Sequence, residues 1–312
     1  MGWEDRIGRR LKLRDVHILL AVVQSGSMAK AAERLAVSQP VVSKTVADLE
    51  HTLGVRLLDR GRKGIEVTPF GQALLSRGIA AFDELRQGVK EIEFLADPTA
   101  GEVRIAGTPP MVAGLLPLIV QRLRHRHPKL AFQITETYSG PTFYHELRQR
   151  TVDFVIGRMI VGRLERDLDH EILFEDPALV AVGTQSRWTK RRKIELIDLI
   201  DDPWILPRPD TVAGAIVAAT FRAQGLDVPS PAVITNCLPT MTALLATGSY
   251  LAILPQSFTR YVKHRPFKIL PVQLTPTEGA VSIVTLKNRT LSPAARLTAA
   301  CIREVTKPLA RA

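Results

Sequence analysis

Two short segments near the N-terminus carry apolar residues at the spacing of an amphipathic helix. The first begins at Ser27, a residue that can cap a helix, and one face of it would hold Met28, Ala31, Ala32 and Leu35. The second begins at Ser38, has Pro40 in its first turn, and one face of it would hold Val42, Val46 and Leu49. Only Ala36 and Val37 separate the two patterns. The spacing therefore predicts two short helices joined by a tight turn.

The first two turns of the second predicted helix are polar on the side away from its apolar residues. Gln39, Ser43 and Lys44 lie there, and such side chains can donate to phosphate oxygens and to base edges. Two helices joined in this way are typical of a helix-turn-helix. On this segment alone, an ordinary pair of packed helices remains the alternative. The predicted DNA contacts in this region are Ser27, Ser38, Gln39, Pro40, Ser43 and Lys44.

The sequence that follows, VRLLDRGRKGIEVTP at residues 55–69, predicts a β-hairpin. Gly54 ends the preceding helical pattern, and apolar residues alternate with polar ones in the returning strand. The turn carries Arg60, Arg62 and Lys63. A basic hairpin directly after the second helix is expected to act as a wing that meets the phosphate backbone. These three residues complete the predicted DNA contacts.

One long helix is predicted from residue 69 to residue 96, with Thr68 as its cap and Pro69 at its first position. Its apolar residues recur three and four positions apart, as in a coiled-coil seam. They are Phe82, Leu85, Val89, Ile92 and Ala96. A helix buried inside one domain is the alternative, but most of the remaining side chains are polar. We expect a linker helix that forms a homodimer or homotetramer through Phe82, Leu85, Val89 and Ile92, with a hinge at residues 96–101.

From residue 97 onward, strand patterns alternate with helical patterns. EVRIAG and VDFVIG are typical of strands, and a helix is predicted from MVAGLL onward; this order favours parallel βαβ units. A second series of strands and helices lies within the first. The order predicts two lobes, with residues from about 162 to 266 in the second. The expected domains are therefore 1–68, 69–96 and 97–312.

The segment GSMAKAAERLAVSQPVVSKTVADLEHTLGVRLLDR, followed by VTPFG, resembles the N-terminal signature of the LysR-type transcriptional regulators. The match runs from Leu11 to Phe94, although Met28 and Leu58 stand where Phe is expected, and Val41 where Ala is usual. The resemblance implies a mainly α winged helix-turn-helix, a long linker helix and an α/β bilobal effector domain like that of periplasmic binding proteins. DFVIGRM resembles the branch that includes regulators of protocatechuate catabolism and of a galactose-type sugar-binding protein.

Ligands of such sheets bind beyond the carboxyl ends of strands, often at helix N-termini whose free N–H groups favour an anion. The resemblance implies that these strand-to-helix junctions line an effector cleft between the lobes. Thr108 could offer its hydroxyl, and Arg158 could pair with an acidic ligand. Ordinary turn chemistry is the alternative for each of these residues. The predicted effector contacts are Thr108, Pro109, Ser139, Gly140, Arg158, Arg208, Thr211, Asn236, Pro239 and Thr240.

The amino-acid composition agrees with the predicted domains and adds little to them. The chain has 312 residues, 46% of them hydrophobic and 23% charged, which is enough for two or three globular domains. A net charge of +11 suits double-stranded DNA as a partner. Cys237 and Cys301 have no metal-ligand or redox spacing, so we expect no disulfide, metal or cofactor. The charged N-terminus and the lack of a long apolar run predict a cytoplasmic protein with no membrane contact.

Together these patterns predict a sequence-specific DNA-binding transcriptional regulator that responds to a small-molecule effector. A small carboxylate or another compact anion is the expected effector. The sequence has no phosphate-binding loop, zinc-protease or nucleophile-elbow motif, so we expect no enzyme and assign no catalytic residue. A bilobal solute-binding protein would share the two lobes but would have no use for the winged region. A DNA-associated enzyme acting on a small acid is the other alternative.

Overall fold

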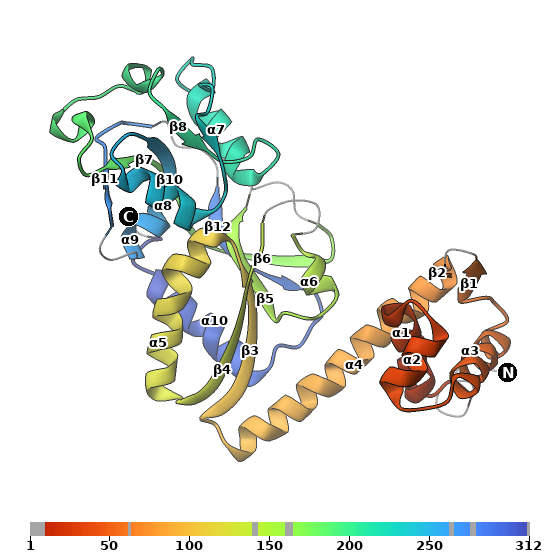
Figure 1. Ribbon diagram of the computed structural model, residues 1–312. Helices are drawn as coiled ribbons and strands as arrows, with labels where there is room; N and C mark the ends of the chain where they lie inside the picture. Colours follow the sequence, from red (N-terminus) through yellow and green to blue (C-terminus); the bar gives the residue numbers. More distant parts are fainter. Residues whose placement is uncertain are drawn as a thin grey trace. The chain divides into compact units, whose positions relative to one another are not determined.

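The computed structural model describes residues 10–61, 64–138, 143–159, 165–261, 265–274 and 279–310, without the side chains of Arg60 and Met159. The chain divides into two compact units, residues 1–86 and 87–312. Each unit has its own hydrophobic core. The first unit is made of helices and a hairpin, and the second contains two sheets flanked by helices (Figure 1).

The first unit contains the predicted pair of helices. They are α2 (Met28–Leu35) and α3 (Gln39–Leu53), and α1 (Leu13–Ser25) precedes them. The Ser27 hydroxyl caps α2 by accepting a hydrogen bond from the Lys30 backbone N–H at 3.2 Å. The apolar positions predicted from the spacing pack in one cluster: Met28, Ala31, Ala32, Val42, Val46 and Leu49 are buried, and Leu35 is half-buried against them. The two predicted helices and their packing faces are therefore confirmed.

A two-stranded hairpin follows α3, as the sequence predicted. It consists of β1 (Leu58–Gly61) and β2 (Gly64–Val67), which pair antiparallel. The Glu50 carboxylate on α3 accepts hydrogen bonds from the backbone N–H groups of Leu57 and Leu58, at 2.7 and 3.1 Å. A side chain of α3 thus fixes where the hairpin leaves the helix.

The long helix α4 (Pro69–Ala96) has the predicted bounds. The Thr68 hydroxyl caps it by accepting a hydrogen bond from the Gly71 backbone N–H at 3.0 Å. Phe82 is half-buried, with its ring centroid 5.7 Å from that of His17, so it packs against α1. The apolar residues further along the helix are largely exposed on this chain: Leu85 at 56%, Val89 at 55%, Ile92 at 68% and Leu95 at 76%.

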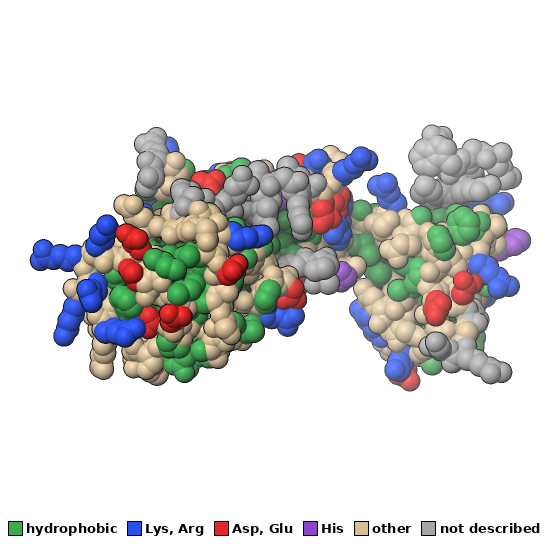
Figure 2. Space-filling view, turned by 90° about the horizontal axis from the view of Figure 1, so that it is seen from above, with side chains coloured by type: hydrophobic (Ala, Val, Ile, Leu, Met, Phe, Trp, Pro, Cys, Tyr) green, Lys and Arg blue, Asp and Glu red, His purple; other side chains and the backbone are tan. Residues whose placement is uncertain are grey.

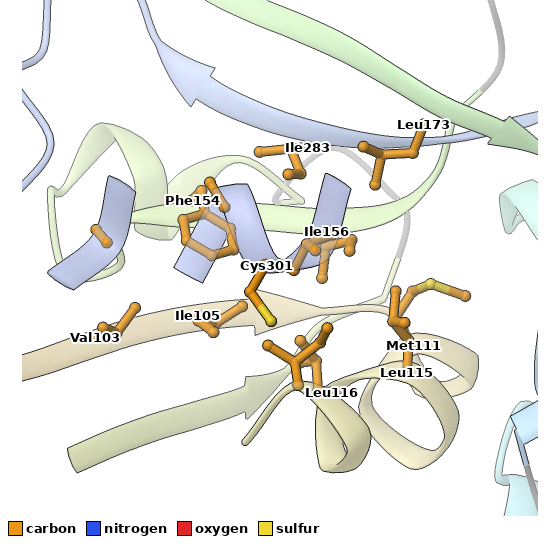
Figure 3. Close-up of a cluster of buried hydrophobic side chains, with 14 of the residues drawn as sticks. Val103, Ile105, Met111, Leu115, Leu116, Phe154, Ile156, Leu173, Ile283 and Cys301 are labelled. Atoms are coloured by element: carbon orange, nitrogen blue, oxygen red, sulfur yellow. The ribbon is translucent and has the colours of Figure 1, made fainter. Parts of the chain in front are cut away.

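The first sheet of the second unit has the strand order β4-β3-β5-β12-β6. Its strands are β3 (Ala100–Gly107), β4 (Lys129–Glu136), β5 (Phe154–Met159), β6 (Leu168–Glu175) and β12 (Ala280–Leu286). The helices beside it are a π-helical turn (Met111–Leu115), α5 (Leu116–Arg126), α6 (His145–Arg148) and α10 (Pro293–Thr306). Apolar side chains of β3, β5 and β12 meet those of α5 and α10 in the core (Figure 3).

The second sheet has the strand order β11-β7-β10-β8-β9. Its strands are β7 (Ala178–Gly183), β8 (Trp204–Leu206), β9 (Val233–Ile234), β10 (Leu251–Pro255) and β11 (Phe267–Ile269). Its α-helices are α7 (Val212–Arg222), α8 (Leu238–Ala246) and α9 (Gln256–Tyr261), and two 3-10 turns lie at Arg187–Lys190 and Leu196–Leu199. Trp204 is fully buried in this sheet, and its ring meets the edge of Phe221.

The strand β6 lies in a different sheet from the one predicted. The sequence placed residues from about 162 in the second lobe, but β6 pairs antiparallel with β12 in the first sheet. The second sheet therefore begins at Ala178, just after β6 ends. Strand pairing depends on a partner more than a hundred residues away, and the local pattern of β6 carries no information about that partner.

Two other expectations are only partly met. The parallel pairing holds for β3 with β4 and β5 and for β8 with β9 and β10, whereas β6, β7, β11 and β12 pair antiparallel. The helix predicted over TFYHELRQR forms a single turn, α6, among the described residues. The stretch ends at Thr151, whose backbone N–H donates a hydrogen bond to the Glu146 carbonyl oxygen at 3.0 Å.

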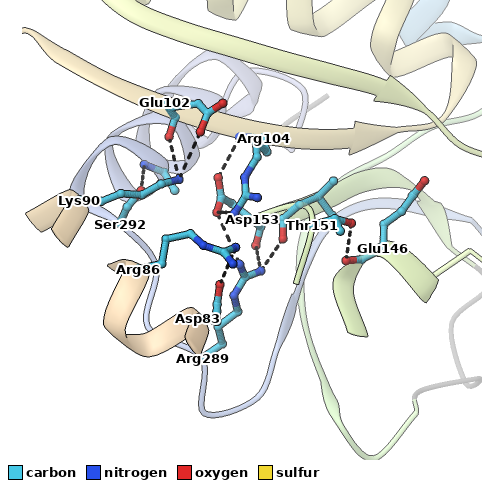
Figure 4. A network of polar contacts seen from close by, with 12 residues as sticks. Asp83, Arg86, Lys90, Glu102, Arg104, Glu146, Thr151, Asp153, Arg289 and Ser292 are labelled. Atoms are coloured by element: carbon cyan, nitrogen blue, oxygen red, sulfur yellow. Dashed lines mark hydrogen bonds and ion pairs between the residues drawn. The ribbon is translucent and has the colours of Figure 1, made fainter. Parts of the chain in front are cut away.

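A buried charged cluster joins three segments of the first sheet (Figure 4). The Asp153 side chain accepts a hydrogen bond from the Arg104 backbone N–H at 2.8 Å. Its other oxygen lies 3.7 Å from the Arg104 guanidinium and 3.6 Å from that of Arg289. Arg289 also donates to the Val152 carbonyl. Because both Asp153 and Arg289 are buried, their charges depend on these partners.

Two glycines of α4 give a matched test of the packing at the start of this helix. A Cβ at Gly71 would lie 2.1 Å from the Leu57 carbonyl oxygen, whereas a Cβ at Gly88 would meet nothing within 4 Å. Gly71→Ala should lower the free energy of unfolding of the first unit by about 1–3 kcal/mol. Gly88→Ala should raise stability by about 0.5–1 kcal/mol, because alanine favours the helix. Urea unfolding of both variants measures the difference, and equal effects would contradict the close contact.

Candidate functional site

The N-terminal end of α3 presents polar side chains on an exposed surface. Ser38, Gln39, Pro40 and Lys44 are exposed and Ser43 is half-buried, while the opposite face of the helix is buried. The Ser38 side chain makes no cap hydrogen bond with α3. The Ser27 hydroxyl accepts from Lys30 as a cap, and its own proton is still available to an acceptor. The predicted DNA contacts of this region therefore lie at the N-terminal ends of two helices, Ser27 at α2 and the others at α3.

The hairpin carries the remaining predicted DNA contacts. Arg62 and Lys63 lie outside the described residues, and only the backbone of Arg60 is described, where it pairs with Ile65. Lys and Arg side chains stand out from the visible face of both units (Figure 2). On this face basic side chains occur on both units, so they do not by themselves mark the DNA-binding surface.

A cavity of about 120 Å³ lies in the second unit, where strand ends of both sheets meet. Thr108 follows β3, Arg158 belongs to β5, and Asn236 follows β9, and all three line the cavity. Thr211, the N-cap of α7, also lines it. The remaining lining is mostly apolar and includes Met111, Val212, Ile216, Val217, Leu238, Met241, Ile253 and Leu254. This position agrees with the rule that ligands bind beyond the carboxyl ends of strands.

Half of the predicted effector contacts line this cavity. They are Thr108, Pro109, Arg158, Thr211 and Asn236. Arg208 is exposed and pairs with Asp210 at 2.7 Å, and its backbone N–H donates to the Asn236 side chain at 3.1 Å. Pro239 and Thr240 are exposed on the first turn of α8, outside the lining. Ser139 and Gly140 lie outside the described residues.

Helical turns begin at several points of the cavity wall. The Thr108 carbonyl accepts hydrogen bonds from the backbone N–H groups of Met111 and Val112, at 2.9 and 3.0 Å. The Thr211 hydroxyl donates to the Arg208 carbonyl at 2.7 Å and accepts from the Gly214 N–H at 3.2 Å. Thr108 and Thr211 thus approach the cavity from opposite sheets, each fixed by its own helical turn.

Among the described residues, two charged side chains line the cavity, Arg158 and Asp176. The Arg158 guanidinium donates to the Gly279 carbonyl at 3.1 Å, and burial lowers the pKa of Arg158. The two oxygens of the Asp176 carboxylate accept from the backbone N–H and the hydroxyl of Ser257, at 2.8 and 2.7 Å. Burial raises the pKa of Asp176, and the Ser257 hydrogen bonds and the Arg158 charge oppose that shift.

The sequence did not predict Asp176 as a cavity residue, whereas Tyr138 belongs to YSGP at residues 138–141, a strand-end junction that the sequence indicated. Asp176 stands in FEDPA, which resembles an ordinary turn before a proline, although its place directly after a buried strand was a usable signal. Tyr138 lies two residues past β4, and its hydroxyl donates to the Glu136 carboxylate. That hydrogen bond, with burial, raises the pKa of Tyr138 to about 12.

The described part of the chain holds no group of three or more His, Cys, Asp or Glu side chains arranged to bind a metal ion. Within the same residues, no helix is both long enough and apolar enough to span a bilayer. Cys237 is exposed and Cys301 is buried, and neither forms a disulfide among these residues.

Family models match both units. The model described as "Bacterial regulatory helix-turn-helix protein, lysR family" matches residues 13–72, and the "LysR substrate binding domain" model matches residues 96–307. The chain belongs to the LysR family. As a LysR-family member it is a transcriptional regulator with a DNA-binding helix-turn-helix and an effector-binding domain.

Relatives of similar length carry the same kind of name. The LysR chain is 27% identical to the "Uncharacterized HTH-type transcriptional regulator YdcI" of Escherichia coli K12, over 95% of this chain and 96% of that one. It is 27% identical to GbpR of Azospirillum brasilense, over 94% and 86%, and 25% identical to PcaQ of Agrobacterium fabrum, over 97% and 97%. GbpR and PcaQ match the branch that DFVIGRM suggested. All three are named transcriptional regulators, which favours that function over a solute-binding protein or an enzyme.

Solved structures share the fold. A full-length OxyR variant from Pseudomonas aeruginosa matches with a TM-score of 0.69 at 21% identity, over 96% of this chain and 97% of that one. Full-length CbnR complexed with its target DNA matches with a TM-score of 0.63 at 21% identity, over 94% and 99%. The predicted architecture of a winged helix-turn-helix, a linker helix and a bilobal α/β domain is therefore that of full-length LysR regulators.

Proposed function

We propose that this LysR-family regulator binds operator DNA in the cytoplasm as a homodimer or homotetramer, and that its effector is a small carboxylate or another compact anion. The observation that carries the effector proposal is that Thr108 and Arg158 line one small cavity at the strand ends. A hydroxyl donor and a guanidinium are suited to carboxylate oxygens. The apolar remainder of the wall would exclude water and strengthen that pairing.

The proposed DNA contacts follow from the two faces of α3. Its apolar face packs in the core, and Gln39, Ser43 and Lys44 are hydrogen-bonding side chains in its first two turns that lie outside that face. Gln can pair with adenine through two hydrogen bonds, and Lys can donate to phosphate or guanine. We assign base contacts to Gln39 and Ser43, and phosphate contacts to the hairpin residues Arg60, Arg62 and Lys63.

The proposed assembly rests on α4. Leu85, Val89 and Ile92 are more than half exposed and recur at coiled-coil spacing. Exposing three large apolar side chains in a row is costly in water, and pairing with the same stripe of a second copy would bury them. Two recognition helices on one dimer could then contact two half-sites about one helical turn apart, roughly 34–36 Å.

The proposed switch couples the cavity to this assembly. An effector can shift DNA binding only if it prefers one arrangement of the two lobes, because equal affinity for both would move no population. A ligand in this cavity would have such a preference, because the strand ends of both sheets contribute to the wall and its contacts would change with the arrangement of the lobes.

The base-reading role of Gln39 is tested by Gln39→Ala. The variant should lose specific operator binding by roughly 1–3 kcal/mol while its affinity for random DNA changes little, because only base contacts distinguish sequences. Gln72→Ala removes an exposed glutamine from α4 and serves as the matched control. Titration of both DNAs at one salt concentration measures the ratio, and an equal loss on both DNAs would refute the assignment.

The seam is tested by the double variant Leu85→Glu and Val89→Glu. Charges in an apolar interface should leave monomers that bind paired half-sites at least about tenfold more weakly. Ser76→Glu adds a charge on the opposite side of the same helix and should leave assembly unchanged. Analytical ultracentrifugation measures the oligomeric state, and an unaltered dimer in the double variant would rule out this seam.

The effector cavity is tested by Thr108→Val and Arg158→Ala in the full chain. Both should abolish the response to small carboxylates while operator binding without ligand stays intact. Thr240→Val and Arg208→Ala make the same chemical changes outside the cavity and should have no effect. Calorimetry against a panel of aromatic and sugar acids supplies the measurement. Binding that survives both cavity substitutions unchanged would place the effector elsewhere.

A further inference from the structure

The two charged residues of the cavity are held together by one carbonyl group. The Arg158 guanidinium donates to the Gly279 carbonyl oxygen at 3.1 Å, and the Asp176 backbone N–H donates to the same oxygen at 3.4 Å. Strand register gives the same arrangement, because Arg158 pairs opposite Val281 and Glu175 opposite Ala280 on β12. Arg158 and Asp176 thus reach the cavity from the two strands that flank the start of β12.

The position of Arg158 depends on the residue at position 279. A Cβ there would lie 2.3 Å from the Arg158 Nε atom, so only glycine lets the guanidinium come this close to the backbone. The Asp176 carboxylate accepts two hydrogen bonds from Ser257, and these occupy two of the roughly four acceptor positions of the carboxylate. The side chain is 2% exposed, lines the cavity, and has acceptor capacity left for a ligand.

This carboxylate restricts what can bind beside Arg158. A purely anionic ligand would bring its charge next to a buried carboxylate, and repulsion between like charges is strong where water is excluded. A ligand that also carries a positive group would satisfy both residues. The rest of the cavity offers apolar side chains, and the described lining holds no further Lys, Arg, Asp or Glu.

We infer that the effector is a compact zwitterion, an α-amino acid with a small apolar side chain, whose carboxylate pairs with Arg158 and whose ammonium group pairs with Asp176. The inference rests on the proposed function, since it names the chemical class of ligand for the same cavity. The volume of about 120 Å³ fits this class, because a 150 Å³ apolar cavity accommodates a benzene ring. Met111, Ile216 and Met241 would surround the ligand's side chain.

The test compares amino acids with the same molecules lacking the ammonium group. Calorimetry on the full chain would use L-alanine, L-valine and L-leucine beside propanoate, 3-methylbutanoate and 4-methylpentanoate. At least one amino acid should bind roughly tenfold or more tightly than its partner acid, the gain expected from one charge-assisted hydrogen bond. This comparison needs no variant, so it stands even if a substitution prevents folding.

Variants then assign the gain to a residue. Asp176→Asn should remove the preference for the amino acid, while Glu175→Gln, which removes the neighbouring exposed carboxylate, should preserve it. Arg158→Gln should weaken amino acid and acid alike. Equal binding of acid and amino acid, or a preference that survives Asp176→Asn, would overturn the inference, and acid binding that still needs Arg158 would leave the proposed function standing. Binding that is indifferent to Arg158→Gln, or no binding of either series, would overturn both.

Discussion

The pairing of β12 with β5 and β6 is the constraint on which the effector unit depends. β12 enters the first sheet more than a hundred residues after its neighbours and separates them. Its register sets Arg158 and the end of β6 on either side of its first residues. The Gly279 carbonyl, just before β12, then receives hydrogen bonds from both sides. The positions of the two charged residues that line the cavity, Arg158 and Asp176, therefore follow from the sheet pairing.

The same pairing makes the second sheet an insertion held at both ends. The chain leaves the first sheet after Glu175 and returns to it at Ala280. Asp176 stands at the first crossing and Gly279 at the second, and both contribute to the cavity wall or its support. A ligand that pairs with Asp176 and with side chains of the second sheet would favour one arrangement of the two sheets. Under the proposed function, binding would be coupled to the arrangement of the lobes through the segments that connect them.

The sequence predicted the α3 surface more completely than the cavity, and the reason is physical. Ser27 and Thr68 mark helix starts by short-range hydrogen bonding, and Pro40 marks the first turn of α3. The helical period then determines which residues remain exposed. Thr108 and Arg158 were also predictable, because a strand end can be recognised locally. Asp176 also follows a buried strand, but its role depends on Ser257 and Gly279, which lie far from it in the sequence. The sheet assignment of β6 failed for the same reason, as its partner lies far along the chain.

Two buried charged clusters in this unit differ in a way that bears on function. Around Asp153, the guanidinium groups of Arg104 and Arg289 lie at 3.7 and 3.6 Å, so the charges compensate one another inside the protein. Asp176 instead accepts two hydrogen bonds from Ser257, and burial raises its pKa. The Arg158 charge opposes that shift, but no ion pair of Asp176 with Lys or Arg within 4 Å occurs among the described residues. Burying a carboxylate without a close counter-charge lowers stability. A ligand ammonium group would supply that counter-charge and offset the destabilisation, which would favour binding of a zwitterion.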